Sequence, residues 1–428
     1  MPVEPAGSVL TDHAVAVRDG NIEAVLPAGE ARQRFPGYEQ VDLPEHVLIP
    51  GLVNAHTHAA MTLMRGLADD LPLMRWLEEH IWPAEKRHVS AQFVRDGTLA
   101  ACAEMLRGGI TCFNDMYFFP DAALESALEA GMRSVHGIIV IEFPSAYAAD
   151  AADYLRKGLE VRDRYRDERL ASFCIAPHAP YTVADASLRQ VAVLAAELDL
   201  PVHMHVHETE HEVQGSLAEH GVRPLERLRR LNLLGPNLIA VHAVHLNAEE
   251  IALLAHHASS VVHCPSSNLK LASGFAPVAK LAKAGVNIAL GTDGAASNNR
   301  LDVFQEMRTA ALLAKAVAGD AQAMPAHDVL RAATLGGAQA LGLGERIGSI
   351  RAGKAADLAA VALRGAELAP CYDAVSHLVY AAGREHVTHV WIDGELQLAE
   401  GKLRSPAFSR LDTRLPIWQN ALRPLAGP

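Results

Sequence analysis

The sequence predicts an α/β protein, a (β/α)8 TIM barrel with a small β-sandwich domain built from both chain ends. First, residues 47–294 alternate short apolar runs rich in Val and Ile with longer Ala, Leu, Glu and Arg stretches of helical period. Second, both flanks show the residue alternation of paired strands. Third, 50% hydrophobic and 21% charged residues among 428 are ordinary globular usage, which allows a large core. We expect the β-sandwich domain over residues 1–49 and 345–428, and the barrel over residues 50–344.

Eight segments of the central region have the composition and length of buried strands. They are Val47–Asn54, Ile110–Asp115, Ser134–Ile141, Ala171–Ala176, Pro201–His207, Leu238–His245, Ser259–Cys264 and Val286–Thr292. Helical patterns lie between them, as in Ala184–Leu198, Gly221–Leu231 and Ala248–His256, with Thr182 and Asn247 as start signals. Eight strands that alternate with helices predict a closed parallel barrel. The stretch 59–109 is too long for an ordinary loop, so we expect extra helices there, beside the barrel mouth.

Both flanks contain a hairpin signal. Alternating residues in 13–49 are interrupted by Asp19-Gly20, and those in 357–403 by Asp393-Gly394. Asp-Gly is a preferred sequence for two-residue hairpin turns. The two ends therefore predict one β domain outside the barrel.

Charge and cysteine usage restrict the partners and the compartment. The net charge of −12 repels phosphate backbones, so we expect no nucleic-acid partner. Five widely spaced cysteines without a CxxC pair favour a reducing compartment over a disulfide framework. Residues 1–5 do not begin a signal peptide, and no 18 apolar residues run together. We expect a cytoplasmic protein with no membrane partner, and a homo-oligomer that uses the outer barrel helices.

The most unusual feature of the composition is its 22 histidines, several of which fall where predicted strands end. Active sites of these barrels collect at the C-terminal ends of the strands. The strand-end side chains are His56 and His58, His178, the run His203, His205, His207 and Glu208, then His242, His245, His263 and Asp293. Residues two apart in a strand share a face, so His56 and His58 can bind one metal ion, and the three histidines of the fifth strand share a face.

Imidazoles with one carboxylate and no thiolate predict one divalent metal ion, most simply zinc, with iron or manganese as alternatives. His56, His58, one histidine of the fifth strand and Asp293 would leave a position for water. A bound metal lowers the pKa of that water to about 7. Glu208 lies three residues after His205 and is a candidate proton shuttle.

Several motifs together resemble the amidohydrolase superfamily, specifically its 5-methylthioadenosine/S-adenosylhomocysteine deaminases. They are Pro50-Gly-Leu-Val-Asn-Ala-His-Thr-His58, His205-x-x-Glu208, His263-Cys-Pro-Ser-Ser-Asn268, Gly291-Thr-Asp-Gly294 and the closing Gly348-Ser-Ile-Arg-Ala-Gly-Lys-Ala-Ala-Asp-Leu358. The resemblance covers nearly the whole chain. Relatives usually begin with a further strand before Val9, so the chain start is either truncated or one strand short.

The resemblance implies hydrolytic removal of the 6-amino group of 5′-methylthioadenosine, S-adenosylhomocysteine or adenosine. It makes His56, His58, His205 and Asp293 the metal ligands. It makes Glu208 the acid/base residue, His242 the histidine that orients the water, and Asp293 a second proton carrier toward ammonia. It also implies that Glu85 of Trp82-Pro-Ala-Glu85 binds the ribose hydroxyls, with Trp82 and His178 as further substrate contacts. Arg156 is the nearest candidate for a contact to the tail of the substrate, although no motif identifies it.

Three other functions stay open from the sequence. A related enzyme could act on another amino- or chloro-heterocycle, such as guanine or an s-triazine. His207-Glu-Thr-Glu-His211 matches H-E-x-x-H, the zinc-peptidase motif, although it begins in a strand pattern. A barrel used only for binding is the third. His256, His257, His327 and His386 lie in helical or peripheral stretches and are expected to have no role in the site.

Overall fold

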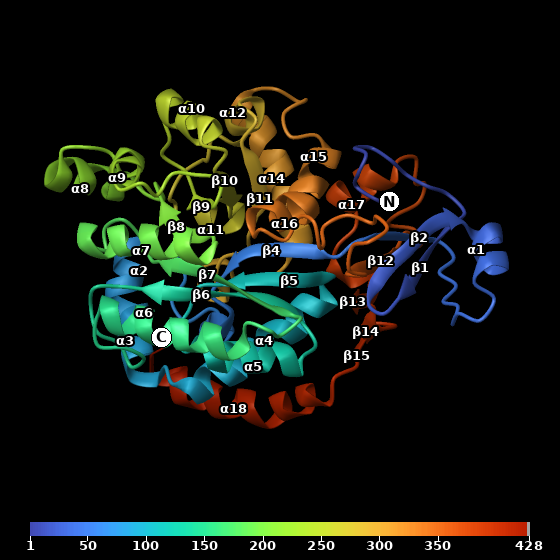
Figure 1. Ribbon diagram of the computed structural model, residues 1–428, viewed down its shortest axis with the longest axis horizontal. Coiled ribbons are helices and arrows are strands. Elements are labelled where there is room, and N and C mark those ends of the chain that lie inside the picture. The colour runs from blue at the N-terminus through green and yellow to red at the C-terminus, as the bar shows by residue number, and fades with distance from the viewer. Residues whose placement is uncertain (426–428) are drawn as a thin grey trace.

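The centre of the computed structural model, which describes residues 1–425, is an eight-stranded parallel sheet (Figure 1). Its strands pair in chain order: β4 (Leu52–Thr57), β5 (Ile110–Asp115), β6 (Arg133–Val140), β7 (Ala171–Pro177), β8 (Val202–Val206), β9 (Leu238–His242), β10 (Ser260–His263) and β11 (Asn287–Leu290). The backbone N–H of Asp293 donates to the carbonyl of His56 at 3.0 Å, which joins the last strand to the first. The predicted TIM barrel is confirmed.

Helices connect these strands and cover the outside of the barrel (Figure 1). They are α5 (Pro120–Glu129), α6 (Ala151–Tyr165), α7 (Asp185–Leu198), α8 (Glu210–His220), α9 (Pro224–Arg230), α10 (Ala248–His256), α11 (Pro265–Lys270), α12 (Val278–Lys283), α13 (Ala295–Asn298) and α14 (Val303–Ala318). Asn247 caps α10 with a complete capping box, as its sequence predicts. The prediction for Thr182 is wrong, because α7 begins after Ala184, and the Thr182 hydroxyl instead donates to the Ala179 carbonyl.

The long stretch after β4 folds into helices at the barrel mouth, as expected. These are the 3-10 helix η1 (Ala59–Met64), α2 (Leu73–Trp76), the π-helix η2 (Leu77–Ile81), α3 (Trp82–His88) and α4 (Ala91–Arg107). They contribute a separate apolar cluster that includes Met64, Trp76 and Phe93. This segment therefore forms a wall of the mouth with a core of its own.

The first predicted strand is corrected by the structure. Val47–Asn54 is two strands, since β3 (His46–Pro50) ends before Gly51 and pairs antiparallel with β12 (Leu358–Ala362) outside the barrel. The Gly51 N–H donates to the Asp357 carbonyl at 2.8 Å, and a Cβ at Gly51 would overlap the Thr111 side chain. The sequence could not reveal this change of sheet, because the apolar run continues from β3 into β4.

Strands that precede and follow the barrel in the sequence form a β domain beside it, whereas the C-terminus lies on the opposite side of the molecule (Figure 1). Its antiparallel sheet has the order β15-β14-β13-β12-β3, with β13 (Val387–Ile392), β14 (Glu395–Ala399) and β15 (Lys402–Leu403). A separate hairpin of β1 (His13–Arg18) and β2 (Asn21–Pro27) packs Ile22 against Leu358 and Trp391. Both predicted Asp-Gly turns are present, with positive φ at both residues of each turn, as hairpin turns of this kind require.

The β domain is tied to the barrel by a buried ion pair. Arg133, at the start of β6, donates through Nε at 2.7 Å and through one terminal nitrogen at 3.0 Å to the two carboxylate oxygens of Asp357. Both side chains are buried. A two-point contact of this kind gives a specific relative geometry.

The remaining helices complete the barrel and the C-terminal region. They are α1 (Ala28–Arg34), α15 (Ala326–Arg331), the π-helix η3 (Ala332–Gly336), α16 (Gly337–Ala340), α17 (Ala374–Tyr380), η4 (Arg384–His386), η5 (Pro406–Arg410), α18 (Leu411–Leu422) and η6 (Arg423–Leu425). Trp418 and Arg414 of α18 both donate to the Asp96 carboxylate at 2.8 Å, which fastens α18 to α4. Within residues 1–425, none of the helices combines the length and hydrophobicity needed to cross a bilayer.

Candidate metal centre and active site

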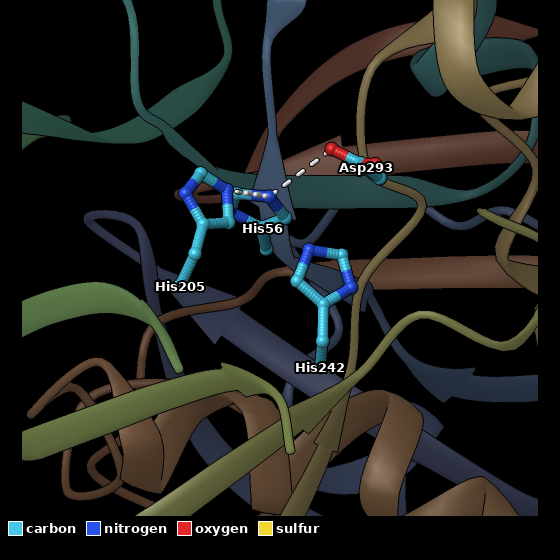
Figure 2. A group of neighbouring side chains, drawn as sticks. All are labelled: His56, His205, His242 and Asp293. Atoms are coloured by element: carbon cyan, nitrogen blue, oxygen red, sulfur yellow. Dashed lines mark hydrogen bonds and ion pairs between the residues drawn. The ribbon is translucent and has the colours of Figure 1, made fainter. Parts of the chain in front are cut away.

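Four side chains from four strand ends converge at the barrel mouth. His56 of β4, His205 of β8, His242 at the end of β9 and Asp293 after β11 each offer a ligand atom within 4.8 Å of the others. In Figure 2, His56 lies between His205 and Asp293, and the ring of His242 lies beside them. His56 Nε2 lies 3.2 Å from both His205 Nε2 and an Asp293 oxygen. All four residues are buried.

The backbone at these strand ends is unusual and aims the side chains. His242 has φ 70° and Asp293 has φ 61°, both in the left-handed region that costs energy for residues other than glycine. In each case the strand has ended and the chain turns across the mouth. This backbone conformation directs the side chains of His242 and Asp293 over the barrel axis toward His56.

His58 joins this group through Asp293. Its Nδ1–H donates to the Met116 carbonyl at 2.6 Å, and its Nε2 lies 3.2 Å from the Asp293 oxygen that also faces His56. Burial alone would lower the His58 pKa, but the Asp293 carboxylate raises it to about 9. The structure thus brings together all four residues predicted as ligands, and it brings His242 as close as they are.

The donor set suits a cation. His205 donates Nδ1–H to the His178 carbonyl at 2.8 Å, and His242 donates its own to Asn268 Oδ1 at 2.9 Å. In a neutral ring of this tautomer Nε2 carries the lone pair, and the Nε2 atoms of both residues face the centre. If His56 also ligates through Nε2, its lone pair and that of His205 Nε2 lie 3.2 Å apart. A metal ion between the two atoms removes the repulsion. Burial lowers the pKa of His56 to about 4 and that of His205 far below its usual range, as neutral ligands require.

Asp293 is held by two serines that the sequence reasoning did not single out. Ser267 and Ser297 both donate their hydroxyls to Asp293 Oδ2 at 2.6 Å, which leaves Oδ1 toward His56 and His58. Burial opposes its charge, but the hydrogen bonds with these histidines hold the Asp293 pKa well below its usual range. Ser267 lies inside the quoted His263–Asn268 motif and could have been found there, whereas nothing in the sequence marks Ser297.

Glu208 lies beside the cluster, two residues past the end of β8. It is buried, and its Oε2 is 3.8 Å from His242 Nε2. Burial raises the Glu208 pKa, which suits a group that must both accept and release a proton. Glu212 of α8 accepts hydrogen bonds from the backbone N–H groups of His207 and Glu208, each at 2.8 Å.

A cavity opens onto Glu208 and the cluster, and it includes the predicted substrate contacts Trp82, Glu85 and His178. Tyr117 donates its hydroxyl to Glu85 at 2.7 Å, and burial raises the Glu85 pKa to about 7. His178 donates Nδ1–H to the Thr182 hydroxyl at 3.0 Å, which leaves Nε2 as an acceptor. Tyr117 is a further site residue that the sequence did not indicate.

The shared face expected for the three histidines of β8 is only partly correct. His203 faces inward and lies 3.1 Å from His56 Nδ1, so it supports the ring of His56. His207 lies past the strand with φ 55° and instead accepts the Leu225 N–H through Nε2 at 3.1 Å. Among the other strand-end histidines, His245 donates to the Ser273 carbonyl, and His263 is buried at the end of β10.

The H-E-x-x-H match does not have peptidase geometry. His207 and Glu208 lie before α8, which begins at Glu210, so the two histidines are not one turn apart on a helix. His211 lines a second cavity with Glu212 and Arg227. The pattern arose from a strand end followed by a helix start.

Three comparisons agree with this geometry. The model of the amidohydrolase family matches residues 47–396. A protein of Saccharophagus degradans named 5-methylthioadenosine/S-adenosylhomocysteine deaminase is 48% identical over 98% of this chain and 94% of its own. A 5′-deoxyadenosine deaminase of Methanothermobacter thermautotrophicus is 46% identical over 93% of this chain and 90% of its own. The solved adenosine deaminase of Xanthomonas campestris with bound zinc has a TM-score of 0.98 and 53% identity, and the match covers 99% of this chain and 97% of that one.

Proposed function

Because the chain belongs to the amidohydrolase family, we propose that it hydrolyses the 6-amino group of 5′-methylthioadenosine or S-adenosylhomocysteine, with adenosine as a further substrate. The products are the inosine analogue and ammonia. The observation that carries this proposal is a buried carboxylate, Glu208, beside a His/Asp cluster in a cavity that also contains Glu85. The names of relatives with 46–48% identity, all adenine-nucleoside deaminases, support the same reaction.

The cofactor is one divalent metal ion. Zinc fits the imidazole and carboxylate donors and is bound by the solved relative, while iron and manganese accept the same ligands. We assign it to His56, His58, His205 and Asp293. When bound, the ion makes a water molecule acidic enough to supply hydroxide near neutral pH.

The chain's own carboxylates move the protons. The water oxygen forms a bond to C6 of the purine, and Glu208 takes the proton of that water and delivers it to the ring nitrogen N1. His242 presents Nε2 to the water, because its Nδ1–H is held by Asn268. The C6–N bond then breaks, and Asp293 passes the second proton to the leaving ammonia.

The cavity walls hold the nucleoside. Glu85 accepts the ribose hydroxyls with the oxygen that Tyr117 does not use, and His178 Nε2 accepts from the substrate. Trp82 of α3 and Phe143 have ring centroids 6.1 Å apart and form one side of the cavity. Substrate binding therefore combines two polar contacts with a large apolar wall.

A panel of nucleosides tests the proposal. Metal-loaded protein should release ammonia from at least one of the three nucleosides, with loss of the adenine absorbance. If the protein turned over guanine or an s-triazine but none of the three nucleosides, it would instead be the related heterocycle enzyme. Glu85→Ala separates the two substrate classes, since Glu85 matters only where a ribose is present.

Compartment and assembly complete the proposal. All five cysteines are free thiols, and four are buried, which supports a reducing compartment such as the cytoplasm. We also propose a homo-oligomer, which light scattering of the purified protein will test. A monomer at micromolar concentration would contradict it.

A further inference from the structure

None of the described residues that line the active-site cavity is a lysine or an arginine. Its ionisable side chains are four histidines, the carboxyl groups of Glu85, Glu208 and Asp293, and the phenols of Tyr117 and Tyr181. The rest of the wall consists of aliphatic, aromatic and thioether side chains, such as Ile139, Phe143 and Met61, with the hydroxyl of Ser297. The wall beyond the polar groups is therefore apolar, and it carries no lysine or arginine side chain.

The second cavity does not supply the missing cation. It shares Leu73, Tyr181 and Glu208 with the first, and its lining includes Arg227. All three guanidinium nitrogens of Arg227 already donate within the protein, to Asp185, to the Pro180 carbonyl and to the Val183 carbonyl. Arg227 is 5% exposed and is committed to structure.

Arg156, the nearest sequence candidate for a contact to the substrate tail, is also occupied elsewhere. It lies on the exposed side of α6, where it pairs with Asp153 and Glu160 at 2.7 Å each. It does not line either cavity. A carboxylate on the substrate would thus find, among the described lining residues of both cavities, only Arg227, whose guanidinium nitrogens already donate within the protein.

We propose that this enzyme is selective for adenine nucleosides whose 5′ substituent is short and uncharged, such as methylthio or hydrogen, over those that carry an amino-acid tail. This inference rests on the proposed function, and it names the substrate class within it. A carboxylate removed from water without a partner is strongly unfavourable, whereas a thioether packs well on aromatic rings.

The test compares kcat/KM for three substrates of one metal-loaded preparation. We expect 5′-methylthioadenosine and 5′-deoxyadenosine to exceed S-adenosylhomocysteine by at least about tenfold, the change that about 1.4 kcal/mol produces. Equal values for all three would overturn the selectivity while leaving the proposed deamination intact. Absence of turnover with every adenine nucleoside would overturn the deamination itself.

A charge-insertion variant tests the cause. Phe143 lines the cavity and is 40% exposed, so Phe143→Arg can be accommodated at the mouth. It should raise the ratio of S-adenosylhomocysteine to 5′-methylthioadenosine kcat/KM severalfold. Val193→Arg is the matched control, since Val193 is 57% exposed on α7 and lines neither cavity, and its ratio should equal that of the unmodified protein. An unchanged ratio in Phe143→Arg would overturn the assignment of selectivity to the missing cation.

Discussion

The Glu212 carboxylate accepts the backbone N–H of Glu208 at 2.8 Å, across the junction between β8 and α8. Its other oxygen accepts the N–H of His207, whose φ of 55° is in the left-handed region. Glu212 is only 4% exposed, and burial raises its pKa to about 8. One buried carboxyl thus fixes the turn that directs the proposed proton shuttle into the cavity.

Removing this support should slow the reaction without removing the metal. Glu212→Gln replaces one acceptor by an amide NH2 that cannot accept the second N–H, so Glu208 loses its fixed position. We expect kcat to fall about 10–100-fold, as is typical for groups that orient site residues, with little change in KM. Glu219→Gln is the control, because Glu219 lies on the same helix with its side chain 76% exposed. A normal kcat in Glu212→Gln with an unaltered melting temperature would contradict the positioning role.

Glu208→Gln should abolish turnover while metal content stays near one ion per chain. The amide keeps the size of the side chain but cannot take a proton from water, so we expect kcat to fall by at least about 10²-fold, the range for general acid–base groups. Metal analysis beside the activity assay separates loss of the shuttle from loss of the ion. Retained activity would show that the shuttle is another residue.

The serines on Asp293 predict the strength of metal binding. Ser267 and Ser297 orient Asp293 through Oδ2, so the double variant Ser267→Ala/Ser297→Ala should weaken metal affinity about 10–100-fold. Competition with a chromogenic chelator measures this directly, without an activity assay. Chelation should abolish turnover in the unmodified protein, and added zinc should restore it. Unchanged affinity in the double variant would mean that Asp293 is held by its backbone alone.

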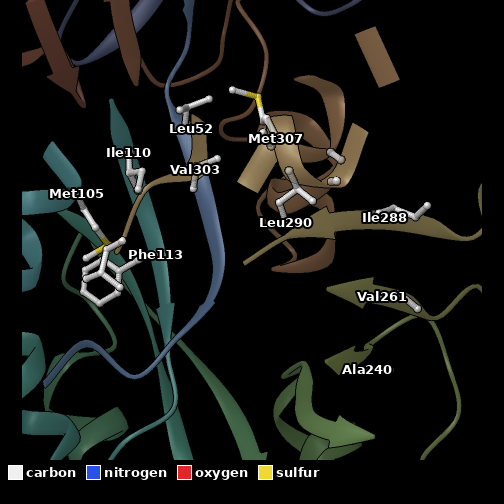
Figure 3. Close-up of a cluster of buried hydrophobic side chains, with 14 of the residues drawn as sticks. Leu52, Met105, Ile110, Phe113, Ala240, Val261, Ile288, Leu290, Val303 and Met307 are labelled. Atoms are coloured by element: carbon white, nitrogen blue, oxygen red, sulfur yellow. The ribbon is translucent and has the colours of Figure 1, made fainter. Parts of the chain in front are cut away.

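How well the sequence predicts the fold depends on how each element is buried. Strands inside the barrel are buried on both faces, so continuous apolar runs mark them well, and Ile110–Asp115 matches β5. Figure 3 shows Leu52, Phe113, Val261 and Leu290 of four such strands within one core cluster. The end of a strand is less visible, because pairing stops where the backbone turns; the segment predicted to run to His245 ends its pairing with His242.

Some residues of the candidate site can likewise be predicted from the sequence, and others cannot. His56 and Asp293 can be recognised in the sequence because metal-ligand side chains stand at the ends of predicted strands. Ser297 and Tyr117 are ordinary residues that become site residues only through long-range proximity, as when Tyr117 meets Glu85. Nothing local in the sequence encodes that contact.

The ion pair between Arg133 and Asp357 predicts a large stability effect at the junction of barrel and β domain. Both groups are buried, so Arg133→Met leaves the Asp357 charge without its partner and should destabilise the protein by about 3–5 kcal/mol. The double variant Arg133→Met/Asp357→Leu removes both charges and should recover much of that loss. Chemical denaturation of the three proteins measures the differences. Equal midpoints for the single variant and the unmodified protein would contradict a stabilising role.

Glu85 predicts a pH-dependent stability that its replacement removes. Burial raises its pKa in the folded protein from 4.5 to about 7, so the folded state holds a proton that the unfolded chain releases earlier. Protonated Glu85 therefore makes its full contribution to the free energy of unfolding below about pH 4.5. This contribution is lost as the pH rises to about 7 and the buried carboxyl ionises. Glu85→Gln keeps an acceptor for Tyr117 but carries no charge, so its melting temperature should exceed that of the unmodified protein by more at pH 8 than at pH 5. A bound cation favours the ionised carboxylate and should reduce this difference in metal-loaded protein. A difference in melting temperature that is the same at both pH values in metal-free protein would show that Glu85 stays ionised throughout.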